Sequence, residues 1–187
     1  MSIFISQQII FLQSIENLLN RKFKADYPNQ KWVTDISFIH IGSQRLYLSA
    51  IMDLYNNEIV AYELSNRNDN QLVLNTIRRA VEKQKDVFGI ILHSNRGYQY
   101  TSGAYHDMLH QFGVISSMYR KGNCYDNACI ESFFSHLKTE ALYTHNIQNV
   151  QEAQKVICEY IQFYNLERIQ IKLNQLPPVE YRRQNMA

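Results

Sequence analysis

The chain has 187 residues, of which 45% are hydrophobic, so it can bury a core and is not intrinsically disordered. Its formal net charge of +2 permits a nucleic-acid-binding surface but does not require one. Three cysteines without a C-x-x-C spacing argue against a disulfide framework or a zinc site and fit a reducing cytoplasm. No apolar run reaches the roughly 18 residues that a membrane span needs, so we expect no membrane partner.

The first half of the chain predicts a helix followed by three strands. Apolar residues at helical spacing favour an amphipathic N-terminal helix over a signal peptide: Phe11, Leu12, Ile15, Leu18 and Leu19. β-branched and aromatic residues then predict strands over 31–40, 45–54 and 58–65. Asn56 and Asn57 are typical of a turn, which makes the second and third strands a hairpin.

Strands and helices alternate after the hairpin. A helix over 68–84, capped by Asn68 or Asp69, precedes a continuous apolar strand over 87–94. The pattern continues with a helix over 101–113, a strand over 114–119, a polar loop, and helices over 127–142 and about 150–165. Pro177 and Pro178 prevent the tail from continuing the last helix.

This order predicts an α/β fold with a mixed five-stranded sheet and helices on its faces. It is the order expected of a ribonuclease-H-like fold. We divide the chain into an N-terminal helical extension (1–30), a core (31–165) and a C-terminal tail (166–187).

Three polar residues stand where strands and helices can bring them together. Asp35 lies inside the first strand among apolar neighbours, Asn95 ends the fourth strand, and Glu131 lies in the first turns of the helix over 127–142. Acidic groups that converge at one sheet edge can hold two Mg²⁺ ions, which activate a hydroxyl and stabilise a leaving oxygen in phosphoryl transfer. Taken singly, an aspartate in a strand is more often an edge charge, and a glutamate on a helix is usually solvated.

Four segments together resemble bacterial insertion-sequence transposases of the retroviral-integrase-like superfamily: WVTDISFI, LHSNRGYQYTS, SMYRKGNCYDNACIESFFSHLKTE and YIQFYNLERIQIKLNQLPPVEYR. The resemblance covers about residues 20 to 183. It implies a ribonuclease-H-like integrase catalytic core with an Asp-Asp-Glu triad and two Mg²⁺ or Mn²⁺ ions, which cuts and joins DNA at the ends of a mobile element. Its partners would be element ends and target DNA, bound by a homo-oligomer, and it would be cytoplasmic, associated with the nucleoid when on DNA.

The resemblance assigns Asp35 and Glu131 as the first and third acids, both catalytic and metal-binding. The second position is Asn95, where the family has aspartate. An amide keeps a carbonyl acceptor but carries no charge, so metal binding is expected to weaken. Asp126 is not expected to substitute, because it projects from a different helix face than Glu131. In this family a helix-turn-helix region usually precedes the core, whereas only about 30 residues precede Trp32.

Several residues near these positions could contact DNA. Arg120, Lys121 and Lys138 could bind phosphates, although a solvated basic face is the alternative. Tyr98, Tyr100 and Tyr119 could stack on bases. His93 should point to the same strand face as Asn95, where it either shapes the site or only packs.

His106 and His110 have a metal-binding spacing but no evident third ligand, so zinc is not expected there. The sequence thus predicts a transposase integrase core for DNA strand cleavage and transfer, impaired by Asn95. A non-catalytic DNA-binding or oligomerising remnant of a decayed mobile element is the alternative.

Overall fold

The computed structural model describes residues 16–19, 23–119 and 128–186. Five strands form one sheet in the order β3-β2-β1-β4-β5. Antiparallel pairing joins the first three strands, β1 (Lys31–Ile41), β2 (Gln44–Asp53) and β3 (Ile59–Ser65). The parallel strands β4 (Ile91–Ser94) and β5 (Ile115–Met118) complete the sheet beyond β1. The mixed five-stranded α/β sheet predicted from the sequence is therefore confirmed.

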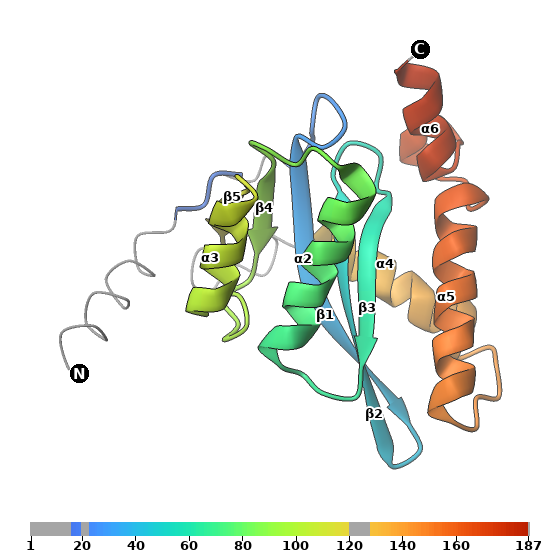
Figure 1. The fold of residues 1–187 in the computed structure, drawn as a ribbon. Helices are drawn as coiled ribbons and strands as arrows, with labels where there is room; N and C mark the ends of the chain where they lie inside the picture. The colour runs from blue at the N-terminus through green and yellow to red at the C-terminus, as the bar shows by residue number, and fades with distance from the viewer. Residues whose placement is uncertain (1–15, 20–22, 120–127, 187) are drawn as a thin grey trace, which may run out of the picture.

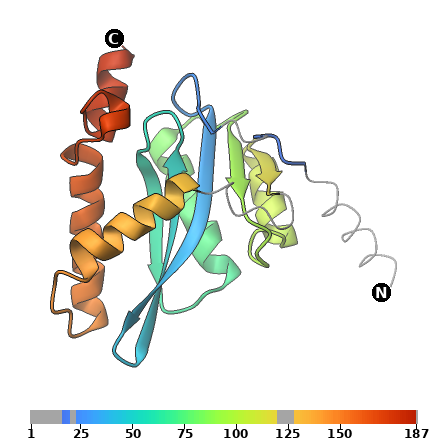
Figure 2. The same ribbon diagram turned by 180° about the vertical axis from the view of Figure 1, so that it is seen from behind.

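Helices cover both faces of the sheet (Figure 1). One face carries α2 (Asn70–Gln84) and α3 (Gly103–Gln111). The other carries α4 (Ala128–His136), which crosses the sheet diagonally, and α5 (Val150–Leu166), as Figure 2 shows from behind. A π-helix, η2 (Leu137–Leu142), continues α4 directly.

Strand periodicity divides the core into two layers. Along β1, Val33, Ile39 and Ile41 pack with α4, η2 and α5, whereas Trp32 packs with α2 and α3. Alternate residues of a strand point to opposite faces, so the odd-numbered positions of β1 face α4. Asp35 is one of these positions.

Local capping agrees with the sequence. Asp69 is the N-cap of α2, and its carboxylate accepts from the backbone N–H of Leu72 (3.2 Å). Ser102 caps α3, and Gly113 adopts a positive φ of 67° just after that helix ends.

The C-terminal segment contains a helix that the sequence analysis did not predict. After the short 3₁₀ helix η3 (Ile171–Leu173), α6 (Pro178–Asn185) begins with a proline at its first position. Proline lacks an N–H but suits the first turn, where that N–H has no helical partner. The helix α5 has already ended at Leu166, well before the prolines, and Pro178 instead begins a new helix.

The predicted N-terminal helix lies largely outside the described residues. Residues 16–19 and 23–30 contain no helix, although Leu19 is buried in the core on the α4 side. Among the described residues, no helix is both long and apolar enough to cross a membrane.

Candidate active site

Asp35, in the interior of β1, meets Asn95, the residue that follows the parallel strand β4. The β1–β4 ladder pairs Val33 with His93, and the next residue on the same face of each strand is Asp35 or Asn95. The Asn95 side-chain N–H donates to Asp35 Oδ1 over 2.7 Å. Residues 60 positions apart (95 − 35) are thus in direct contact, and both are half-buried.

The amide of Asn95 has a defined orientation. Its oxygen accepts from the backbone N–H of Gly97 over 2.6 Å, which closes a local turn, while its nitrogen faces Asp35. A reversed amide would place oxygen against a carboxylate and N–H₂ against N–H, so both hydrogen bonds would be lost. A Cβ on Gly97 would lie 2.8 Å from Asn95 Oδ1, so a larger residue here would force the Asn95 amide to move.

Glu131 lies in the first turn of α4, the helix that packs against β1. Its side chain is exposed and makes no hydrogen bond or ion pair with any described residue. Glu131 thus belongs to the helix that covers the face of β1 on which Asp35 lies. Arg120, Lys121 and Asp126 fall outside the described residues.

His93 is fully buried behind Asn95. Its Nδ1 lies 2.8 Å from Ser117 Oγ, and its ring packs against Tyr119 with centroids 4.5 Å apart. Burial lowers the pKa of His93 to about 4, so the ring is neutral at pH 7. This arrangement fits packing and positioning of the strand end rather than proton transfer.

The tyrosines near the site differ in exposure. Tyr98 is 59% exposed, and its hydroxyl donates to the backbone carbonyl of Asn68. Tyr100 is 1% exposed and packs edge-to-face on Tyr105, so the expectation that Tyr100 stacks on DNA bases is wrong. The turn after β4 carries Tyr100 into the core on the α2 side, which spacing in a loop does not reveal. Tyr119 is half-buried against His93.

Lys138 follows α4, where its ammonium group lies 5.6 Å from the centre of the Phe38 ring. Partial burial lowers the pKa of Lys138. His106 is half-buried and His110 is exposed, and the described residues contain no cluster of three or more His, Cys, Asp or Glu side chains suited to a metal.

The residues match a metal site only in part. Carboxylates such as those of Asp35 and Glu131 are the hard oxygen ligands that Mg²⁺ prefers. Asn95 directs nitrogen, which cannot ligate the ion, toward Asp35, and its oxygen is used by Gly97. The donor set therefore fits a site with two carboxylates, in which Asn95 supplies no ligand in its present orientation.

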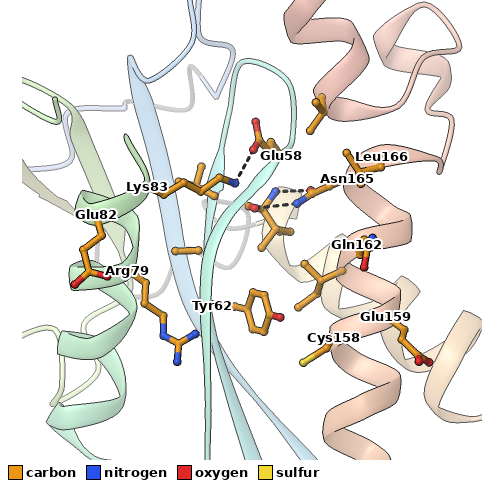
Figure 3. Close-up of a pocket in the computed structure, with 15 residues that line it drawn as sticks. Glu58, Tyr62, Arg79, Glu82, Lys83, Cys158, Glu159, Gln162, Asn165 and Leu166 are labelled. Atoms are coloured by element: carbon orange, nitrogen blue, oxygen red, sulfur yellow. Dashed lines mark hydrogen bonds and ion pairs between the residues drawn. The ribbon is translucent and has the colours of Figure 1, made fainter. Parts of the chain in front are cut away.

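A cavity of about 780 Å³ lies away from these residues, along the edge strand β3 between α2 and α5 (Figure 3). Asn165 occupies one end of this edge, and its amide exchanges two hydrogen bonds with the backbone of Ile59 (2.9 and 3.0 Å). This side chain thus takes the place of a neighbouring strand at Ile59.

Comparison with known proteins agrees with this geometry. Residues 25–124 and 131–186 match two models, each described as an integrase core domain. The chain is 43% identical over 172 residues to the "Putative transposase InsK for insertion sequence element IS150" of Escherichia coli K12, covering 92% of this chain and 61% of that protein. It is 44% identical over 171 residues to an "Uncharacterized transposase-like protein" of Haemophilus influenzae, covering 91% of this chain and 79% of that protein.

Solved structures share the fold at low sequence identity. The structure of the HTLV-2 integrase catalytic core domain in complex with magnesium matches with a TM-score of 0.69 and 11% identity, over 84% of this chain and 99% of that one. A chain of the simian T-cell lymphotropic virus intasome matches with a TM-score of 0.75 and 14% identity, over 85% and 56%. These matches establish a ribonuclease-H-like fold. With the two family matches and the transposase relatives, they show that this chain belongs to the integrase core domain family of insertion-sequence transposases.

Proposed function

We propose that this chain is the core of a transposase that cleaves and joins DNA strands at element ends with a divalent metal, and that Asn95 impairs this activity. The observation that carries the proposal is the hydrogen bond from Asn95 to Asp35, at the position where the family has a second acid. It supports both parts, because Asp35 of β1 contacts the residue that follows β4, and that residue carries an amide in place of a carboxylate.

Asp35 and Glu131 would hold the metal in this proposal. A bound divalent cation supplies positive charge beside the phosphate and makes an attacking hydroxyl more acidic. The chain's own residues fix the geometry: the Gly97 turn holds Asn95, and Asn95 holds Asp35. With Asn95 neutral, the three side chains carry a charge of about −2 instead of −3, so attraction for two cations weakens.

DNA is the proposed substrate, and Arg120, Lys121, Lys138 and Tyr98 are the proposed contacts. Lys138 and Tyr98 are both at least partly accessible. A homo-oligomer on DNA remains part of the proposal, because joining two element ends requires both to be held together.

Strand cleavage of labelled element-end duplexes tests the proposal in Mg²⁺ and in Mn²⁺. We expect little or no cleavage by the chain as it stands. The cleavage rate of Asn95→Asp should be at least about 100-fold higher, because loss of one electrostatic stabilising group typically lowers an enzymatic rate by that factor. Adding Glu131→Gln to Asn95→Asp should remove the gain. Mn²⁺ titration by calorimetry should show tighter binding by Asn95→Asp.

Two results would contradict the proposal in different ways. Full activity with Asn95 would mean that another group supplies the second acid. Unchanged metal affinity in Asn95→Asp would favour the non-catalytic, DNA-binding remnant. In that case the hydrogen bond from Asn95 satisfies Asp35 without a metal ion.

A further inference from the structure

A second cavity, of about 330 Å³, lies beside the second half of β1. Residues 38–42, at the end of β1 and in the turn after it, form one wall, and Lys138, Leu142 and the segment after η2 form the other. β4 pairs with β1 only from Lys31 to Val33, so this part of β1 has no described strand on that edge. Its volume is within the roughly 300–1,000 Å³ range of small-ligand sites.

The cavity is basic. The described residues that line it include Lys138, His40 and His145 but no aspartate or glutamate. The Lys138 ammonium group forms no ion pair with a described carboxylate and instead lies over the Phe38 ring. His145 Nδ1 donates to the Ala141 carbonyl (2.6 Å), so Nε2 of the neutral ring is an acceptor and Lys138 is the phosphate donor among these three side chains. The positive charge of Lys138 suits an anion.

Aromatic side chains stand at the same opening. Phe38 is 52% exposed on a strand, Tyr143 is 76% exposed, and His40 packs edge-to-face on Phe38 with centroids 4.9 Å apart. The floor is apolar, formed by residues such as Ile39 and Leu142. Planar rings beside an unpaired cation are the features that bind a base together with its phosphate.

The cavity also lies near the candidate active site. Phe38 is three residues from Asp35 along β1, and Lys138 is seven residues from Glu131 along the helix, each a path of roughly 10 Å. This is the length of about three stacked nucleotides of one DNA strand. Phe38 occupies an even-numbered position of β1 and points away from the face that carries Asp35, so a strand end held at Asp35 and Glu131 would reach the cavity by passing around the edge of β1 beyond Val33, where no described strand pairs with it.

We propose that this cavity binds one unpaired nucleotide of a DNA strand end, with its base against Phe38 or Tyr143 and its phosphate at Lys138. The inference rests on the proposed action on DNA and names the form of DNA that the site prefers. Neither the sequence motifs nor the family match assigns a role to Phe38, His40, Tyr143 or His145.

Fluorescence anisotropy with two labelled DNAs tests this proposal: a blunt duplex, and the same duplex with a two-nucleotide single-stranded 3′ end. The unmodified chain should bind the unpaired end about tenfold more tightly, since stacking of one base has an effect of this order. In the double variant Phe38→Ala/Tyr143→Ala the ratio of the two affinities should approach one. Lys138→Gln should lower the salt slope for the unpaired end by about one.

Matched controls separate a pocket effect from a general surface effect. Phe88→Ala removes an 84% exposed ring, and Lys155→Gln removes an exposed ammonium, at positions that do not line this cavity. Both should keep the ratio and the slope, and thermal melts should show every variant folded. A ratio that survives the double variant, or falls equally in Phe88→Ala, would overturn the inference.

The two proposals can fail separately. Equal binding of both DNAs by the unmodified chain would overturn the nucleotide pocket alone. Absence of binding to either DNA at low salt would overturn the proposed function, and the pocket with it.

Discussion

Asn95 connects two structural features through the two ends of its amide. Its oxygen bonds the Gly97 N–H and its nitrogen bonds Asp35. An aspartate in its place would keep the first contact, because a carboxylate oxygen also accepts from N–H. It would replace the second with two carboxylate oxygens about 2.7 Å apart. Such a pair requires a bound cation or a shared proton.

The free energy of unfolding of Asn95→Asp should therefore depend on a divalent cation. Without metal at pH 7 we expect a loss of about 2 kcal/mol in the free energy of unfolding, the usual worth of a hydrogen bond to a charged group. For a chain of this length, that loss lowers the melting temperature by roughly 4–8 °C. Mg²⁺ or Mn²⁺ should restore it, because ligands that bind only the folded state stabilise that state.

Thermal melts with and without metal measure this effect. Asn66→Asp makes the same chemical change in an exposed bend and should melt at the same temperature with or without Mg²⁺. If Asn95→Asp were equally stable in EDTA and insensitive to metal, the orientation of the Asn95 amide toward Asp35 would be wrong.

At the scale of elements, the edge strand β3 is held at one end by a side chain. Asn165, on α5, satisfies both backbone groups of Ile59, and Figure 3 marks these two hydrogen bonds. Nearby, Lys83 of α2 pairs with the buried Glu58 over 2.9 Å. Helices on both faces of the sheet thus fix the start of β3.

Asn165→Ala should destabilise the fold by about 2 kcal/mol, because two hydrogen bonds are lost and contribute about 1 kcal/mol each. The backbone N–H of Ile59 should also exchange its hydrogen faster. Gln162→Ala, which lines the same cavity but does not bond the backbone of Ile59, is the matched control and should change stability by less than about 0.5 kcal/mol. Urea denaturation gives the stability and hydrogen exchange gives the local effect; equal losses in both variants would contradict a specific role for Asn165.

For the whole molecule, periodic segments were predictable and long-range docking was not. The strand and helix order followed from apolar spacing, and the contact of Asp35 with Asn95 followed from placing Asp35 inside the first strand and Asn95 at the end of the fourth, which can converge at one sheet edge. The helix α6 was missed because prolines break helices as readily as they begin them, and tertiary contacts decide which occurs. The turn at Gly97 had a local sequence signal, a glycine two residues after an asparagine. The cavity beside β1 had no such signal, because two of its lining residues, Phe38 and Tyr143, are 105 positions apart in the sequence (143 − 38).

The C-terminal helix α6 docks on the hairpin formed by β2 and β3. Asn56, in the β2–β3 turn, donates to the Pro178 carbonyl over 2.9 Å, and Tyr55 packs on Tyr181. Arg182 reaches Glu58 over 3.3 Å, where the carboxylate is buried and also holds Lys83. Burial by itself would raise the pKa of Glu58. The positive charges of Lys83 and Arg182, together with hydrogen bonds to the carboxylate, outweigh this effect and lower the pKa.

Arg182 and Arg183 are neighbours that test this docking. Arg182 has a 20% exposed side chain on a buried acid, whereas Arg183 is 77% exposed and pairs with Glu180 on the same helix. Arg182→Ala should cost about 1.5–3 kcal/mol, because it removes a charged hydrogen-bond donor from a buried carboxylate. Arg183→Ala should cost no more than about 0.5 kcal/mol, as expected of a surface pair. Denaturant unfolding of both variants at pH 7 measures the difference, and equal costs would show that α6 does not depend on the buried Glu58 for its attachment.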